Sequence, residues 1–225
     1  MKKKYSEDGS APRPHVFPVL RWVAVAWMLV WLPAYVHVWG WVNLLHLCDA
    51  AVILTCVGLW LGSARLLSSQ AVGALFAGLL WLTNVAFRLV TGKFFASGSE
   101  YMWNAHYPLW VRLLSFFHVL LPCALIWGLW KLGYDRRGLQ LQAGIAALLL
   151  IASRFLSPEL NMNYAYRDPL FSRSWDPAPL HLMVIFMGAV VLLYWPTHLL
   201  LGRAFRRARV DREEKSSAEA RSSQR

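Results

Sequence analysis

Long apolar segments alternate with short polar ones over most of the chain. Each apolar segment approaches the ~20 residues that a helix needs to cross the hydrocarbon core of a membrane. There are six such segments, at about residues 20–38, 41–61, 66–91, 107–130, 138–156 and 180–201. The pattern predicts an all-α polytopic membrane protein, a bundle of six transmembrane helices.

Polar segments without helical periodicity flank this bundle. Residues 1–18 mix Pro, Gly and Ser with charged residues, and residues 203–225 are rich in Arg. We interpret the first segment as a disordered cytosolic tail and the second as a basic cytosolic tail. The transmembrane domain then covers residues 19–202.

The distribution of Lys and Arg predicts the orientation of the bundle. With six spans and a cytosolic N-terminus, seventeen of these residues lie on the cytosolic side and four on the other side. An excess of Lys and Arg is typical of cytosolic loops. We therefore expect both termini in the cytosol (N-in/C-in).

The composition agrees with a membrane protein and excludes several other classes. Of 225 residues, 57% are hydrophobic and only 16% are charged, whereas a soluble domain has about a quarter charged residues. The net charge of +11 comes mainly from the tails and loops, so it indicates orientation and not a nucleic-acid partner. The three cysteines, Cys48, Cys56 and Cys123, lie in apolar segments and imply no disulfide framework.

Polar residues inside the spans gather, in this orientation, in the outer half of the membrane. They stand three or four residues apart on the second, third and fourth segments: Asn43, His46 and Asp49; Asn84 and Arg88; Arg112, Ser115 and His118. Such spacings place side chains on one helix face. An ionised side chain near the bilayer centre costs about 2.5–3.5 kcal/mol, so these faces predict a shared polar cleft. The alternative is a structural ion pair of Asp49 with Arg88 or Arg112.

The connection between the fifth and sixth segments alternates polar and aromatic residues and contains several prolines. This composition predicts a lid that lies in the interface over the cleft; the alternative is a passive connector. The candidate substrate-binding residues of the cleft and lid are Asn84, Arg88, Arg112, Ser115, Arg154, Asn163, Tyr164, Tyr166 and His181.

Pro122 lies within the fourth segment. It lacks the amide that would bond the carbonyl of His118, four residues earlier. We expect a kink at His118 and a free carbonyl facing the cleft, or else an ordinary proline kink without a function.

Three short motifs carry a resemblance to a known family. They are "LHLCD" at 45–49, "FFHVLLP" at 116–122 and "NYAYRDP" at 163–169, the last followed by "DPAPLHL". In these stretches the chain resembles the YwaF-type bacterial integral membrane proteins. A distantly related vertebrate transmembrane family is implicated in acyl transfer onto ether lysophospholipids. The resemblance implies a multi-pass protein of the bacterial cytoplasmic (inner) membrane, with Cys48 and His118 as catalytic candidates.

These residues suggest lipid acyltransferase or hydrolase chemistry. Cys48 would attack an acyl ester, His118 or His46 would take the proton, and Asp49 would orient the imidazole. Arg88 and Arg112 would hold the lipid phosphate. On an ideal helix, however, Cys48 lies about 100° from Asp49 and about 200° from His46. A His46–Asp49 pair that activates water or a hydroxyl is therefore an alternative.

Two further classes of function stay open at this point. The same polar residues suit a non-enzymatic protein that binds or transports a lipid or small molecule. A b-type haem held by His46 and His118 is a third hypothesis, which visible absorption would test. The expected partner is a membrane lipid, in the enzyme hypothesis a phospholipid; we expect no metal and no cofactor. The sequence makes no prediction of the oligomeric state.

Overall fold

The structure is a computed structural model that describes residues 16–206. The predicted tails, residues 1–18 and 203–225, therefore lie for the most part outside the described residues. The described part of the chain is helical and contains no strand. The all-α fold class is confirmed, and all six apolar segments form helices.

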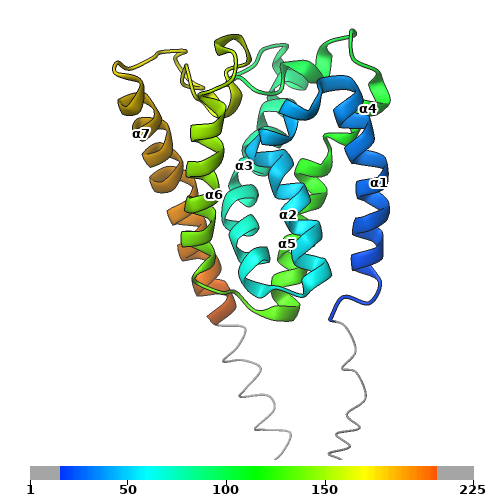
Figure 1. Ribbon diagram of the computed structural model, residues 1–225. Coiled ribbons are helices and arrows are strands. Elements are labelled where there is room, and N and C mark those ends of the chain that lie inside the picture. Colours follow the sequence, from blue (N-terminus) through cyan, green and yellow to red (C-terminus); the bar gives the residue numbers. More distant parts are fainter. Residues whose placement is uncertain (1–15, 207–225) are drawn as a thin grey trace, which may run out of the picture.

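The helices form one bundle (Figure 1). Four helical stretches are long and apolar enough to cross a membrane: Leu20–Trp39, Ala64–Thr91, Leu109–Leu132 and Ala178–Arg206. They correspond to α1 (Leu20–Trp39), α3 (Ala64–Thr91), α4 with α5 (Leu109–Leu114 and Phe117–Leu132), and α7 (Ala178–Ala189), which continues through the π-helical turn η5 (Val190–Tyr194). Their apolar side chains are largely exposed: in the last stretch only 11% of the most apolar window is buried. This exposure fits a lipid environment.

Two apolar helices are shorter, α2 (Leu47–Leu61) and α6 (Gly138–Ser153). Their 15 and 16 residues rise by about 22–24 Å, less than the ~30 Å of a hydrocarbon core. The short helix η1 (Trp41–Leu45) precedes α2. The count of six spans therefore stays a prediction.

The bundle has two distinct ends (Figure 1). The first and last described residues lie at the same end, together with the connections 62–63 and 133–137; we call this the terminal end. The other end carries the connections 40–46, 92–108 and 154–177, with three short helices: η2 (Glu100–Trp103), η3 (Pro158–Leu160) and η4 (Met162–Tyr164). We call it the loop-covered end.

Helix α3 is the centre of the bundle and packs against α2, α5 and α6. Small residues bring its neighbours close. A Cβ at Gly78 would lie 2.5 Å from the carbonyl oxygen of His118 in α5, and a Cβ at Gly138 in α6 would lie 2.7 Å from the Cβ of Ser68. Close backbone approach at small residues is typical of helix packing in membranes.

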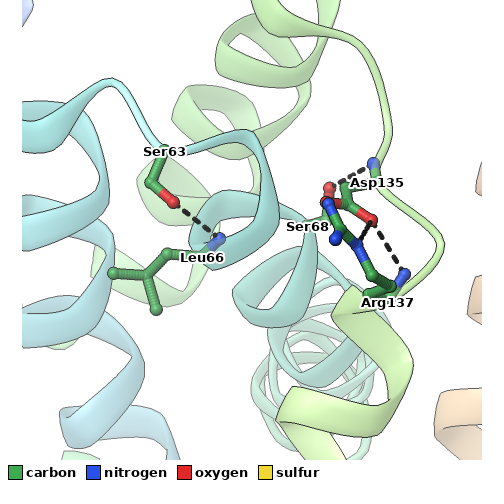
Figure 2. A network of polar contacts seen from close by, with 5 residues as sticks. All are labelled: Ser63, Leu66, Ser68, Asp135 and Arg137. Carbon is green, nitrogen blue, oxygen red and sulfur yellow. Dashed lines mark hydrogen bonds and ion pairs between the residues drawn. The ribbon is translucent and has the colours of Figure 1, made fainter.

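A polar network fixes the terminal end (Figure 2). Ser63 caps α3 by accepting a hydrogen bond from the amide of Leu66 at 3.2 Å. The amide of Asp135 donates to Ser68 Oγ at 2.9 Å. Arg137 donates from Nε (3.1 Å) and its backbone amide (2.9 Å) to Oδ1 of Asp135, and from a terminal nitrogen to Oδ2 (2.9 Å). The α5–α6 connection is thereby held on the start of α3.

The fourth apolar segment is interrupted before its proline. Helix α4 ends at Leu114 and α5 begins at Phe117, so the break lies at Ser115 and Phe116, two to three residues before the kink expected at His118. At the break, backbone amides donate to carbonyls three residues earlier. The amide of Ser115 donates to the carbonyl of Arg112, and the amide of His118 donates to the carbonyl of Ser115. The carbonyl of His118, which Pro122 cannot bond, faces Gly78 of α3. The expectation that it faces a cleft was wrong.

Candidate functional site

Cys48 and Asp49 lie in the first turn of α2, at the loop-covered end. Asp49 is only 2% exposed. Its carboxylate accepts a hydrogen bond from Asn43 Nδ2 at 2.6 Å and one from the thiol of Cys48 at 3.8 Å. The thiol and the carboxylate are therefore neighbours, and the thiol is only partly buried.

The helix break at His46 explains how Asn43 and Cys48 both reach Asp49. Asn43 belongs to η1, and His46 is the N-cap of α2 with an extended backbone (φ −58, ψ 136). Residues 43–49 therefore do not form a single helix. The angle of 200° between Cys48 and His46 and the shared face of Asn43, His46 and Asp49 do not apply, whereas the 100° between Cys48 and Asp49 still holds, because both belong to α2.

Hydroxyl groups from three other parts of the chain lie near this pair: Tyr35 in α1, Tyr101 in η2 and Ser115 at the end of α4. The hydroxyls of Tyr35 and Ser115 lie 2.6 Å apart, and Ser115 is fully buried. Trp81 Nε1 donates to the hydroxyl of Tyr101 at 3.2 Å. Tyr35 and Tyr101 each lie within electrostatic range of both Cys48 and Asp49. We call the five residues Tyr35, Cys48, Asp49, Tyr101 and Ser115 the polar centre.

His118 lies beside the polar centre. Its ring stacks on Trp81 (4.6 Å between centroids) and on Phe117 (4.1 Å). Nδ1 lies 2.8 Å from the carbonyl oxygen of Ser115. A carbonyl only accepts, so Nδ1 carries a proton and Nε2 is the basic nitrogen of the neutral ring. His118 interacts electrostatically with His46, but within residues 16–206 neither histidine hydrogen-bonds to Cys48.

No ion pair joins Asp49 to Arg88 or Arg112. Within the described residues the one ion pair is Arg137–Asp135, at 2.9 Å. The guanidinium of Arg88 lies over Phe94 (4.8 Å) and near Trp103 (6.0 Å). The structural ion pair considered from the sequence is therefore not formed.

Arg112 contacts the loop that follows α3. It donates to the carbonyl of Met102 at 2.8 Å, while its buried Nε has no partner. Arg88 also contacts this loop, through Phe94 and Trp103. Arg88 and Arg112 therefore each contact residues of this loop.

Asn84 holds the same loop down on α3. Its Nδ2 donates to the carbonyl of Ala96 (2.8 Å) and to Ser99 Oγ (2.7 Å). Its Oδ1 accepts from the amides of Phe95 and Ala96. With all polar atoms of this 3% exposed side chain bonded, Asn84 is an anchor of the loop.

Asn163 attaches the long loop before α7 to two helices. Its Oδ1 accepts from the amide of Leu47, which satisfies a free donor at the start of α2. Its Nδ2 donates to the carbonyl of Leu45 (2.8 Å) and to Ser153 Oγ at the end of α6 (2.9 Å). The sequence-predicted lid residue is thus a cap for the helix that carries Cys48.

The other candidates from the lid support its own fold. The guanidinium of Arg154 lies 3.9 Å from the ring centroid of Tyr166, and the hydroxyl of Tyr166 donates to the carbonyls of Arg154 and Leu156. His181 Nε2 lies 2.9 Å from the carbonyl of Tyr164, and the ring stacks on Trp175. Nδ1 of His181 is buried without a partner.

The two long loops are bound to each other over this end of the bundle. Ser97 donates to the carbonyl of Pro169 (3.2 Å), and the hydroxyl of Tyr164 donates to the carbonyl of Ser97 (3.3 Å). Burial tends to raise the pKa of Asp168, but the amides of Phe171, Arg173 and Leu170 donate to its carboxylate and hold the pKa below its ordinary value. Within the polar centre Tyr35, Asp49 and Ser115 are buried, and Cys48 and Tyr101 are partly exposed.

Sequence reasoning did not include Tyr35 or Tyr101 among the site residues. Tyr35 reads as one more aromatic in an apolar segment, and Tyr101 as a loop residue. Their proximity to Asp49 depends on packing between distant segments. No spacing along the chain signals it.

Comparison with known proteins gives no match: no family, no curated protein and no solved structure is similar to this chain. The part of the chain that the structure describes also contains no group of three His, Cys, Asp or Glu residues able to hold a metal ion.

Proposed function

We propose that the protein is a membrane enzyme that hydrolyses or transfers the acyl group of a lipid ester at the polar centre, with Cys48 as the nucleophile. The observation that carries this proposal is the contact between the partly buried Cys48 thiol and the buried Asp49 carboxylate. An ionisable pair inside an apolar bundle is costly and marks a functional site by default. The resemblance to the YwaF-type family agrees with the proposal.

The first step is attack of the Cys48 sulfur on the ester carbonyl. An S–C bond forms and the thiol proton passes to the Asp49 carboxylate. When the intermediate collapses, the C–O bond of the ester breaks and the leaving alkoxide takes that proton. A thioester on Cys48 and an alcohol, such as a lysophospholipid, result.

The second step returns the thiol. Water, for hydrolysis, or the hydroxyl of an acceptor lipid, for transfer, attacks the thioester carbonyl and gives its proton to Nε2 of His118 or to Asp49. The C–S bond breaks, and the Cys48 thiolate takes the proton back. His118 Nε2 is suited to this role because Nδ1 is bonded to the carbonyl of Ser115.

Phenol groups are available to stabilise the negative charge that develops on the carbonyl oxygen. The oxygen of Tyr101 is held by a hydrogen bond from Trp81 and also interacts with Ser115, and its O–H would donate to the substrate. A fixed donor of this kind, screened from water, stabilises an oxyanion strongly. Substrate reaches Tyr101 and Cys48 when the two long loops separate.

The test is turnover by purified protein in phospholipid vesicles. Released fatty acid and lysophospholipid are measured by mass spectrometry, and the acyl-enzyme is sought as a hydroxylamine-sensitive mass increase. We expect Cys48→Ala to abolish both signals and His118→Ala to reduce turnover by about 10²–10⁴-fold. Cys123→Ala, which removes an exposed thiol, is the matched control. Full turnover by Cys48→Ala overturns the assignment of the nucleophile.

A second function, binding or transport of a lipid or small molecule without chemistry, is favoured by one observation. Neither His46 nor His118 hydrogen-bonds to Cys48 within the described residues, and an adjacent carboxylate disfavours the thiolate. Under this hypothesis the vesicles yield no product, while ligand retention depends on Tyr35 and Tyr101. Absence of turnover combined with loss of retention in Tyr101→Phe supports it.

We also propose that all six apolar helices cross the bacterial cytoplasmic membrane with both termini in the cytosol. The common position of the two described chain ends and the excess of Lys and Arg support this topology. Labelling of single cysteines placed at Lys93 and Arg203 with a membrane-impermeant maleimide tests it. Modification in intact cells is expected at position 93 and not at position 203.

A further inference from the structure

A cavity of about 740 Å³ opens at the terminal end, away from the polar centre. Its walls come from three parts of the chain: the start of α3, the end of α5 with the α5–α6 connection, and the last turn of the final helix. Its charged and aromatic lining residues are Lys131, Tyr134, Asp135, Arg136, Phe205 and Arg206. The volume is in the range of sites that bind small molecules or headgroups.

The cavity carries three cations and one carboxylate, and the carboxylate is already neutralised. Both oxygens of Asp135 are bonded by the side chain of Arg137 (Figure 2). These bonds hold the pKa of Asp135 below its ordinary value. Within the described residues, Lys131, Arg136 and Arg206 form no ion pair with a carboxylate.

The loop that carries two of these residues is fixed in place. Ser68 Oγ accepts a hydrogen bond from the backbone amide of Asp135. The close contact of Gly138 with Ser68 positions the first turn of α6 against α3. On the other side, the hydroxyl of Tyr134 lies 2.7 Å from Nδ1 of His198 in the last helix. The cavity is therefore built by bonds between elements.

Exposed apolar side chains stand close in the chain to residues that line the cavity. Trp130 is 57% exposed on α5, and Leu200 is 59% exposed near the end of the last helix. Lys131 lies over the ring of Trp127 at 5.8 Å. A ligand with a phosphate group and acyl chains would place its charge in the cavity and its chains along these side chains.

We propose that this cavity binds a phosphate-bearing anion, the headgroup of an anionic phospholipid or a soluble phosphate compound. Phosphate is suited to the site because Arg136 and Arg206 offer guanidinium groups that pair with no carboxylate of residues 16–206. The proposal does not depend on the chemistry at the polar centre.

The experiment uses the full chain in detergent, with two probes measured separately. Native mass spectrometry counts retained phosphatidylglycerol and retained phosphatidylcholine of the same acyl chains, and equilibrium dialysis measures radiolabelled inorganic phosphate. The cavity variant combines Lys131→Gln, Arg136→Gln and Arg206→Gln. The control variant combines Lys93→Gln, Arg167→Gln and Arg173→Gln, an equal charge change at the loop-covered end.

Preferential retention of phosphatidylglycerol, reduced about tenfold or more in the cavity variant and unchanged in the control, supports the lipid source. Phosphate binding that is lost in the cavity variant, without a lipid preference, supports the soluble source. Equal behaviour of the two variants, or no binding of either probe, overturns the proposal. If the triple variant fails to fold, Arg136→Gln alone replaces it. This exposed side chain forms no hydrogen bond or ion pair with the described residues, and a several-fold loss of binding is still expected.

Discussion

At the loop-covered end Asp49 is buried and its described partners, Asn43 and Cys48, are uncharged, whereas at the terminal end Asp135 is partly exposed and pairs with Arg137. The same contrast holds for the arginines. Arg112 is partly buried and donates to a backbone carbonyl, while Arg136 and Arg206 line an open cavity without a carboxylate partner in the described chain.

The difference shows how solvent decides the form of a polar site. Water at the terminal end hydrates unpaired cations, so they stay available to a ligand at little cost. Beneath the loops, most polar atoms have a partner inside the protein, because an unbonded buried group costs about 1–3 kcal/mol. Nε of Arg112 and Nδ1 of His181 are exceptions among the described residues. Substitutions at the loop-covered end should therefore be more damaging than those at the terminal end, and the following predictions test this ranking.

The largest effect is expected for Asn84→Ala. It leaves two partly buried backbone amides and one carbonyl of the loop without their partner, so the free energy of unfolding should fall by about 2–3 kcal/mol. Thermal unfolding in detergent measures the loss, and limited proteolysis should cut the loop at 93–99. Thr83→Ala, at the exposed neighbour bonded only within α3, should leave both readouts unchanged. A stable, uncut Asn84→Ala protein would contradict the anchoring role.

Overpacking between helices should not follow this ranking of the two ends, because a steric clash does not depend on exposure to water. Gly78→Ala places a Cβ 2.5 Å from the His118 carbonyl, and overpacking of this kind costs about 1–3 kcal/mol. Gly144→Ala is the matched control in another helix: a Cβ there has no atom within 4 Å. A thermal midpoint lowered in the first variant and not in the second confirms the contact. Equal midpoints would show that α3 and α5 are not closely packed at this point.

A smaller loss is expected for Tyr35→Phe. It removes one partner of the 2.6 Å contact with Ser115 and should lower the free energy of unfolding by about 1 kcal/mol. The double variant with Ser115→Ala should cost less than the sum of the single variants, since the hydroxyls act as a pair. Strictly additive losses in thermal unfolding would mean that the two groups do not interact.

The smallest effect is expected for Asp135→Asn at the terminal end. The bonds from Arg137 lower the pKa of Asp135, so the pair stabilises the protein at pH values above the ordinary 3.8 and this contribution disappears as the pH falls through the lower folded-state pKa. Because the pair is exposed to water, the loss at pH 7 should stay below about 1 kcal/mol. Thermal midpoints of the two proteins should differ at pH 7 and converge in acid. A difference that grows on acidification would contradict the sign.

The hydrophobic pattern predicted where the helices lie, but not where they break. The apolar segment at 41–61 contains nothing to distinguish His46 as an N-cap, because the acceptor for the Leu47 amide is Asn163, 116 residues later. In the same way, Ser115 stands in a run suited to a continuous helix. The spacing rules used for the polar residues assumed unbroken helices and failed at these two positions.

The sequence predicted many of the polar residues of the loop-covered end but did not distinguish their roles. Asn84 and Asn163 bind loop backbone, and the sequence could not tell such anchors from ligand-binding amides because both are buried polar residues in apolar surroundings. Tyr35 and Tyr101 gave no signal, since a buried tyrosine is ordinary in a membrane helix or an interfacial loop.

The sequence by itself determined an all-α chain with apolar helices suited to a membrane. In lipid, a helix is the simplest structure in which one segment forms all of its own backbone hydrogen bonds. Only the tertiary structure decided which polar side chains meet, which of them bind loop backbone and which cations stay unpaired. Those outcomes depend on hydrogen bonds between residues far apart in the chain. The local pattern of apolar and polar positions does not predict such bonds.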